Sequence, residues 1–331
     1  MINTIPKVSI IVPIHNAGER LTACLDTLIS QSLQDIEIIL VLDCPTDGSN
    51  IIAKQYAEKD KRIIILENQT NLHIGNSRNR GLEIAKGEYI GFSDHDDYRE
   101  LTMYEKLYNN AQFTKSDIVL GISVSVGNQN ESVRFPLSFP NNDLQEYALL
   151  DLIKGGDDLT LTPKATNIHP NIYKTEMLRD NNISFVDTNI YTPEDRIFQI
   201  MCLYFSKTVS LCAEPLYYHT IYLESAGHAV QYQSYKSRVN GKMKVYEFLK
   251  INNCYEKYEP AFLIATKKEF VNYIIEEFHY SKNLYKVFKT INYMKSLPFC
   301  KRAFRNASYS LERYRIGGKL IRKAISLLMC I

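Results

Sequence analysis

Three aspartates lie within four residues of one another, at Asp94, Asp96 and Asp97. Carboxylates this close repel one another, and a hard divalent cation relieves that repulsion. Mg²⁺ and Mn²⁺ prefer oxygen ligands, and their sites often combine one or two carboxylates with the phosphates of a substrate. The structural alternative, which involves no ligand, is a solvated acidic turn in which Asp97 caps the next helix. We take the cluster as a candidate Mn²⁺ or Mg²⁺ site with Asp96 and Asp94 as its ligands.

A second acidic pair, Glu194-Asp195, follows Pro193 at the expected beginning of a helix. Acids in the first turn stabilise a helix through its dipole by about 0.3–1 kcal/mol, and the local sequence favours that interpretation. The alternative is a general base that removes a proton from an acceptor hydroxyl. The pair is therefore a candidate catalytic site whose two members the sequence does not separate.

Three further residues have both an ordinary and a functional interpretation. Asp43 follows a buried strand and is either a turn former or a recognition group. Arg78 lies near the beginning of an expected helix, where a positive charge is unfavourable for the helix but useful beside a diphosphate. His219 is either an ordinary histidine or a contact to a phosphate or a metal.

The elements that must position these residues alternate between strand and helix over the first 120 residues or so. Parallel sheets built from such β-α-β units bind ligands outside the carboxyl ends of their strands. Polar groups follow three of the expected strands, at His15-Asn16, Asp43 and 94–97, so we expect them at one edge. The expected strands are Val8–Ile14, Ile36–Leu42, Ile63–Glu67 and Tyr89–Phe92.

The remainder of the chain gives a weaker pattern. We expect a first domain over 1–233, with halves at 1–120 and 121–233, followed by a helical region at 234–331. Residues 301–331 contain eight basic residues and one acid, with apolar residues at helical spacing. Such a tail either lies on an anionic membrane surface or packs on the protein with a solvated basic face.

Composition excludes several classes of protein. The 331 residues are 45% hydrophobic and 23% charged with a formal net charge of +2, which argues against disorder and against a nucleic-acid binder. No window is long and apolar enough for a transmembrane helix. The seven scattered cysteines form no CxxC pair, and 1–6 has no signal-peptide pattern. We expect a cytoplasmic protein, with possible peripheral contact at the inner membrane face.

The chain also resembles the family-2 glycosyltransferases. The resemblance is close over residues 7 to about 115 and looser up to His219. Its motifs are Val8-Ser9-Ile10-Ile11-Val12-Pro13, Cys24-Leu25-Asp26-Thr27-Leu28, Ile38–Asp43, Asn71, Gly75, Arg78-Asn79, 81–90, Asp94-His95-Asp96-Asp97-Tyr98, Asn171-Ile172-Tyr173-Lys174, Phe185, Glu194-Asp195 and Tyr217-Tyr218-His219.

The resemblance implies a GT-A fold of the α/β class, with a mainly parallel sheet, and an inverting, metal-dependent sugar transfer from a nucleotide diphosphate. It implies a UDP-sugar donor and a saccharide or lipid-linked acceptor in polysaccharide or lipopolysaccharide synthesis. The donor residues carried over by position are Pro13, Asp43, Arg78, Asp94, Asp96 and His219. Asp195 would be the base, with Glu194 beside it. The resemblance also implies that 1–233 is the catalytic domain, with a nucleotide-sugar half at 1–120 and an acceptor half at 121–233.

Two features distinguish this sequence from the family pattern, and two other functions stay open. The family usually has two acidic residues after the second strand, where this chain has Asp43-Cys44-Pro45, and His95 replaces a small residue. A sugar-phosphate nucleotidyltransferase is one alternative, although no glycine-rich basic loop follows the first strand. A non-catalytic relative that binds a nucleotide-sugar or glycan is the other.

Overall fold

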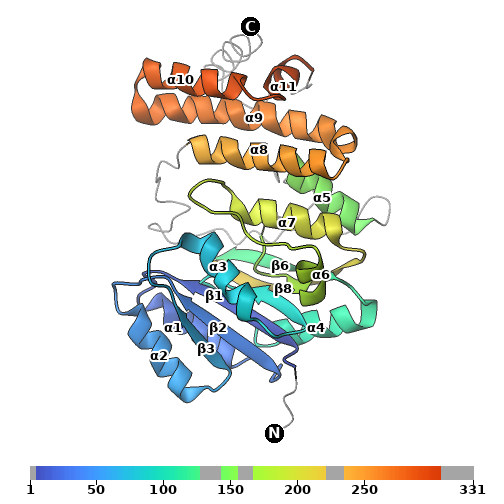
Figure 1. The fold of residues 1–331 in the computed structure, drawn as a ribbon. Helices are drawn as coiled ribbons and strands as arrows, with labels where there is room; N and C mark the ends of the chain where they lie inside the picture. The colour runs from blue at the N-terminus through green and yellow to red at the C-terminus, as the bar shows by residue number, and fades with distance from the viewer. Residues whose placement is uncertain (1–4, 127–142, 156–166, 221–234, 307–331) are drawn as a thin grey trace. The chain divides into compact units, whose positions relative to one another are not determined.

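A computed structural model describes residues 5–126, 143–155, 167–220 and 235–306 (Figure 1). The chain divides into two compact units, neither of which is continuous in sequence. The sheet unit comprises 1–152, 158–188 and 194–230, and the helical unit comprises 153–157, 189–193 and 231–331. The expected division at 233/234 into a catalytic domain and a helical region stays a prediction, as do its nucleotide and acceptor halves.

The sheet unit is built on one eight-stranded sheet, in the order β3-β2-β1-β4-β7-β6-β8-β5. The four strands expected near the N-terminus are confirmed with the same bounds and are parallel to one another. Farther along the sheet, β7 is antiparallel to both β4 and β6. The strands are β1 (Val8–Ile14), β2 (Ile36–Leu42), β3 (Ile63–Glu67), β4 (Tyr89–Phe92), β5 (Tyr98–Arg99), β6 (Ile118–Val126), β7 (Ile172–Lys174) and β8 (Val209–Thr220).

Strands β1 and β2 are buried along their whole length because helices cover both faces of the sheet. On one face, alternate residues of β1 such as Ile10 join a core with Leu25 of α1 and Leu107 of α4. On the other face, Ile11 lies against Gly81 of α3. The helices of this half are α1 (Arg20–Ile29), α2 (Ser49–Lys59), α3 (His73–Ile84) and α4 (Met103–Thr114).

The contact between α3 and β1 depends on the absence of a side chain at Gly81. A Cβ there would lie 2.5 Å from Cγ2 of Ile11, closer than packed carbons approach. We therefore expect Gly81→Ala to lower the free energy of unfolding by about 1–3 kcal/mol, the usual cost of overpacking a core. Denaturant unfolding would measure it. Glu83→Ala, on the exposed side of the same helix, is the matched control and should stay within about 0.5 kcal/mol of the parent. Equal stability of the two variants would contradict this packing.

Helix α7 (Glu194–Phe205) closes the second face of the sheet. Its Phe198 stacks on Phe185 with ring centroids 4.0 Å apart and meets Phe92 of β4 edge to face at 5.5 Å. The helix begins at Glu194, as expected. The acidic pair therefore occupies the first turn of α7. Helices α5 (Leu144–Lys154) and α6 (Thr175–Asp180) complete this part of the chain.

The described part of the helical unit has four successive helices around an aromatic core. Phe299 contacts the rings of Tyr246, Phe262 and Phe270, with centroids 5.0, 5.0 and 6.3 Å away. Within the described residues, no helix is long and apolar enough to cross a bilayer. The helices are α8 (Tyr235–Ile251), α9 (Tyr255–Ser281), α10 (Leu284–Lys295) and α11 (Cys300–Asn306).

The short segment 189–193 belongs to the helical unit because α8 holds it. The backbone N–H of Thr192 donates to the carbonyl of Ser237 at 3.1 Å, and Nδ2 of Asn240 donates to the carbonyl of Ile190 at 3.1 Å. A Cβ on Gly241 would lie 2.1 Å from the carbonyl oxygen of Thr192, so only glycine permits this approach. Segment 189–193, which α8 holds in this way, ends directly before Glu194, the first residue of α7.

Candidate active site

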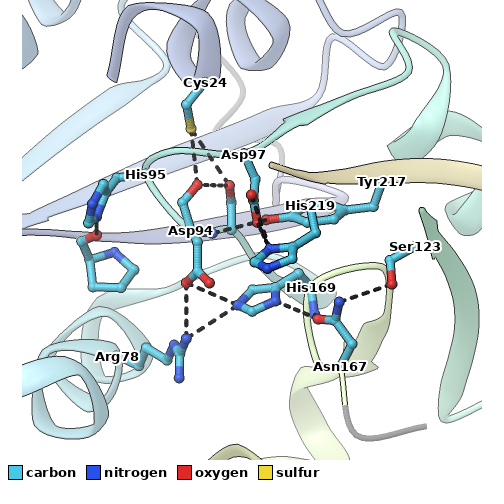
Figure 2. Close-up of polar contacts among 12 residues, drawn as sticks. Cys24, Arg78, Asp94, His95, Asp97, Ser123, Asn167, His169, Tyr217 and His219 are labelled. Carbon is cyan, nitrogen blue, oxygen red and sulfur yellow. Dashed lines mark hydrogen bonds and ion pairs between the residues drawn. The ribbon is translucent and has the colours of Figure 1, made fainter. Parts of the chain in front are cut away.

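The turn after β4 places its three aspartates in three different environments, and Figure 2 shows two of them, Asp94 and Asp97. Asp97 is buried and accepts hydrogen bonds from the hydroxyl of Tyr217 at 2.6 Å and from the backbone N–H of Thr220 at 2.9 Å. The interpretation of Asp97 as a helix cap is wrong, because α4 begins at Met103 with Thr102 at its N-cap position. Asp97 instead ties the turn to the end of β8.

His219, a predicted donor contact, lies beside this anchored carboxylate. Its Nδ1 is 3.3 Å from the carboxylate of Asp97, and that hydrogen bond raises the pKa of His219 above its usual value despite partial burial. The side chain remains 46% exposed, so it can reach a ligand from solvent. A histidine held toward its charged form is suited to contact a phosphate oxygen.

Asp94 is paired with two cationic or potentially cationic groups. Nη2 of Arg78 and Nε2 of His169 lie 3.1 and 3.0 Å from the same oxygen, Oδ1. Burial alone would raise the pKa of Asp94, but His169 and Arg78 outweigh it and hold this pKa well below its usual range. Asp94 is therefore ionised at neutral pH, and its Oδ2 makes neither of these contacts.

Arg78 also reaches the second acidic motif. Its guanidinium is only 2% exposed, and Nη1 donates to Oε1 of Glu194 at 3.1 Å. One buried arginine thus connects the carboxylate turn after β4 with the first turn of α7. Burial and the neighbouring Asp195 raise the pKa of Glu194, and Arg78 opposes them. Asp195 makes no ion pair with Arg78, and its Oδ1 accepts from the N–H of Arg196 at 2.7 Å.

His169 is a member of the site that the sequence analysis did not identify. Its Nδ1 is 2.5 Å from Oδ1 of Asn167, whose Nδ2 donates to Oγ of Ser123 at 3.0 Å. The imidazole also stacks on the ring of Tyr217, with centroids 5.5 Å apart. These contacts fix the ring orientation, so that Nε2 faces Asp94 as Figure 2 shows.

Asp96 differs from Asp94, which pairs with Arg78, and from Asp97, which is held by Tyr217 and Thr220. Among the described residues, no arginine or lysine forms an ion pair with Asp96. Burial raises its pKa, His95 lowers it, and the charges of Asp94 and Asp97 raise it further. His95 is not turned into solvent: its Nδ1 lies 3.2 Å from the carbonyl oxygen of Pro13, which ties the turn to β1. Asp96 is left as a carboxylate that is poorly neutralised by the protein.

These residues fit a divalent cation that is held jointly with a substrate. In the described part of the chain, no three His, Cys, Asp or Glu side chains gather into a metal cluster. Asp96 and Asp94, whose Oδ2 contacts neither Arg78 nor His169, nevertheless provide the one or two carboxylates with which Mg²⁺ or Mn²⁺ binds together with phosphates.

Asp43 lies at the carboxyl end of β2, as expected, and is held in place there. Its Oδ1 accepts from Nδ2 of Asn68 at 2.8 Å and from the N–H of Leu72 at 2.7 Å. Asn68 also donates to Oγ of Ser77 in α3, the residue before Arg78, at 3.1 Å. Asp43 and Arg78 are therefore positioned by one hydrogen-bonded network, although no contact joins Asp43 to Asp94 directly.

A mainly parallel sheet with carboxylates at its carboxyl edge and an acidic pair at a helix start defines the class of GT-A glycosyltransferases. The sequence profile of "Glycosyl transferase family 2" matches residues 9–174, half of the chain. The chain belongs to this family, and the resemblance inferred from its motifs is confirmed.

Relatives and solved structures agree with this assignment. The poly(ribitol-phosphate) beta-glucosyltransferase of Bacillus spizizenii is 31% identical over 68% of this chain, which spans only 34% of that protein. The uncharacterized glycosyltransferase EpsJ of Bacillus subtilis is 33% identical over 64% of this chain and 60% of its own length. The structure of S. aureus TarS 1–349 with UDP-GlcNAc has a TM-score of 0.72 and 21% identity, covering 98% of this chain and 89% of the other. That likeness confirms the expected GT-A fold.

Proposed function

We propose that the chain is an inverting glycosyltransferase that moves a sugar from a UDP-sugar to the hydroxyl of a saccharide acceptor. One observation carries the proposal: Arg78 is buried and forms ion pairs with both Asp94 and Glu194. Asp97 is held separately by Tyr217 and Thr220, so the two carboxylates outside these pairings are Asp96 in the turn after β4 and Asp195 in the first turn of α7.

The two remaining carboxylates suit the two requirements of an inverting transfer. Asp195 takes the proton of the acceptor hydroxyl, whose oxygen bonds to the anomeric carbon on the face opposite the diphosphate. The bond from that carbon to the diphosphate oxygen breaks, and the electron pair leaves with the UDP. Asp96 and Asp94 would hold Mn²⁺ or Mg²⁺, which when bound supplies charge stabilisation to the departing diphosphate.

The other proposed contacts to the donor come from residues at or near the carboxyl ends of strands. Asp43, fixed by Asn68 and Leu72, would accept a hydrogen bond from the base, and His219 would contact the diphosphate. Pro13 lies at the end of β1, where its carbonyl orders His95. The solved complex of TarS with UDP-GlcNAc supports a uridine donor for this fold.

The acceptor we propose is a cell-surface polysaccharide or a lipid-linked saccharide. The support is the relative from Bacillus spizizenii, which is named for poly(ribitol-phosphate). We further propose that the protein works in the cytoplasm and at the inner face of the membrane, with the basic residues of 301–331 in contact with lipid. Of that tail, α11 (Cys300–Asn306) is described, and 307–331 lies outside the described residues.

A panel of nucleotide-sugars tests the donor and the reaction together. With Mn²⁺ present, we expect UDP-sugars to raise the melting temperature more than GDP-, CDP-, ADP- or dTDP-sugars, and one of them to release UDP slowly through transfer to water. Binding without any release of UDP would instead favour a non-catalytic relative. Formation of a nucleotide-sugar and pyrophosphate from UTP and a sugar 1-phosphate would favour a nucleotidyltransferase.

A further inference from the structure

The tip of the helical unit, where α9 meets α10, exposes a group of large apolar side chains. On α10, Leu284 is 62%, Tyr285 76% and Phe288 55% exposed. The opposite side of the same helix is buried through Val287 and Ile291. The exposed residues are therefore additional to those that α10 uses for its own packing.

These side chains form one surface. Leu284 and Phe288 are four residues apart, and Tyr285 is three residues before Phe288, so all three lie on one side of α10. Phe278 and Tyr280 are exposed in the last turn of α9, which a short turn joins to α10 (Figure 1). Contiguous apolar surface of this kind marks an interaction site. We call Phe278, Tyr280, Leu284, Tyr285 and Phe288 the apolar tip.

The charges along the apolar tip are mainly positive. Residues 278–296 contain four lysines and neither Asp nor Glu, and of the two acids just before them Glu276 pairs with Arg238 and Glu277 is buried. Three of the lysines, Lys282, Lys286 and Lys289, are exposed and alternate along the chain with the exposed apolar residues. Aromatic rings settle at the level of lipid headgroups, while lysines bury their stems and attract anionic lipid.

Two other partners for the apolar tip are a second copy of the chain and the C-terminal residues 307–331. The positive charge of the tip argues against both. A second copy of the chain would bring its own lysines against these, and juxtaposed like charges are costly at an interface. The C-terminal residues 307–331 carry five basic residues and one acid, so they too are repelled. An anionic surface remains as the complementary partner.

We propose that the apolar tip and its lysines form a docking surface for an anionic phospholipid bilayer. The aromatic and aliphatic side chains enter the headgroup region, and Lys282, Lys286 and Lys289 pair with lipid phosphates. The contact is peripheral, in keeping with the described helices, none of which spans a bilayer. It is distinct from the contact proposed for the tail and does not depend on transferase activity.

Co-sedimentation of the full chain with vesicles tests the proposal. Vesicles of phosphatidylcholine mixed with phosphatidylglycerol are compared with vesicles of phosphatidylcholine alone. Each lysine near an anionic surface strengthens binding about fivefold before screening by salt. We therefore expect the triple variant Lys282→Gln, Lys286→Gln, Lys289→Gln to bind the mixed vesicles about 10–100-fold more weakly. The triple variant Leu284→Gln, Tyr285→Gln, Phe288→Gln should lose binding to a similar extent.

Two further full-chain variants serve as controls. Phe113→Gln with Ile251→Gln removes equally exposed apolar residues elsewhere and should leave binding unchanged. Lys319→Gln, Arg322→Gln, Lys323→Gln removes charge from the tail, and the tip should still bind. Circular dichroism of each variant serves as the control for folding.

Three results would overturn the proposal: equal binding to both kinds of vesicle, unchanged binding of both tip variants, or loss confined to the tail variant. A dimer that the apolar variant abolishes in size-exclusion chromatography would assign the tip to a second copy. Because vesicle binding needs no turnover, the result is separate from that of the nucleotide-sugar panel.

Discussion

Replacing Asp195 by Asn should lower kcat by about 10²–10⁴, the usual contribution of a positioned general base, while the dissociation constant of the donor stays unchanged. The reason is the distribution of carboxylates in the first turn of α7. Glu194 is paired with Arg78, whereas Asp195 is outside that pair and can receive a proton. Single-turnover kinetics with the donor found in the nucleotide-sugar panel would measure kcat, and calorimetry would measure donor binding.

Glu194→Gln is the matched variant for this experiment. It removes a charge-assisted hydrogen bond to buried Arg78, and such bonds contribute about 1.5–3 kcal/mol. We therefore expect its main effect on the free energy of unfolding, with a smaller loss of kcat than in Asp195→Asn. A larger loss of kcat in Glu194→Gln, with Asp195→Asn nearly normal, would transfer the role of base to Glu194.

The second large effect is expected at Asp96. In Asp96→Asn the turn after β4 loses the carboxylate that pairs with no described arginine or lysine, while Asp94 and Asp97 keep their partners. Removing a group that stabilises charge on the leaving diphosphate typically lowers kcat by about 10²–10³. We expect transfer to fall at least this far, and Mn²⁺ binding in the presence of UDP, measured by calorimetry, to weaken in parallel.

A surface carboxylate provides the control for Asp96. Asp35 is 59% exposed and pairs with Lys7 at 3.5 Å, so Asp35→Asn changes the net charge equally without touching the site. It should retain normal transfer and Mn²⁺ binding. Near-normal turnover and metal dependence in Asp96→Asn would remove Asp96 from the proposed metal site.

The first half of the fold could be predicted because its signals are local. Strands such as Val8–Ile14 and Ile36–Leu42 are short runs of β-branched residues between turn formers, and they are buried on both faces. Beyond residue 126 the elements depend on distant partners. Strand β7 has only three residues, and its antiparallel direction comes from pairing with β4 and β6 rather than from its own sequence.

The same difference explains which site residues could be found. Asp43 and 94–97 follow predicted strands, so their shared edge follows from the parallel sheet. His169 precedes β7, and because β7 is antiparallel, its beginning lies beside the carboxyl end of β4, where Asp94 follows. The sequence of a three-residue strand does not indicate whether the strand runs parallel or antiparallel to its neighbours. The contact of Arg78 with Glu194, 116 residues apart, likewise exists only in the folded chain.

The discontinuity of the helical unit limits how this protein can exchange parts with its relatives. Residues 189–193 are fastened to α8 through Ser237, Asn240 and Gly241, although they lie in sequence within the sheet unit. A chimera joined near residue 233 would place a foreign helix against this segment, and any side chain larger than glycine at position 241 would collide with it. Recombination that preserves the start of α7 must therefore inherit 189–193 and 235–306 from the same parent.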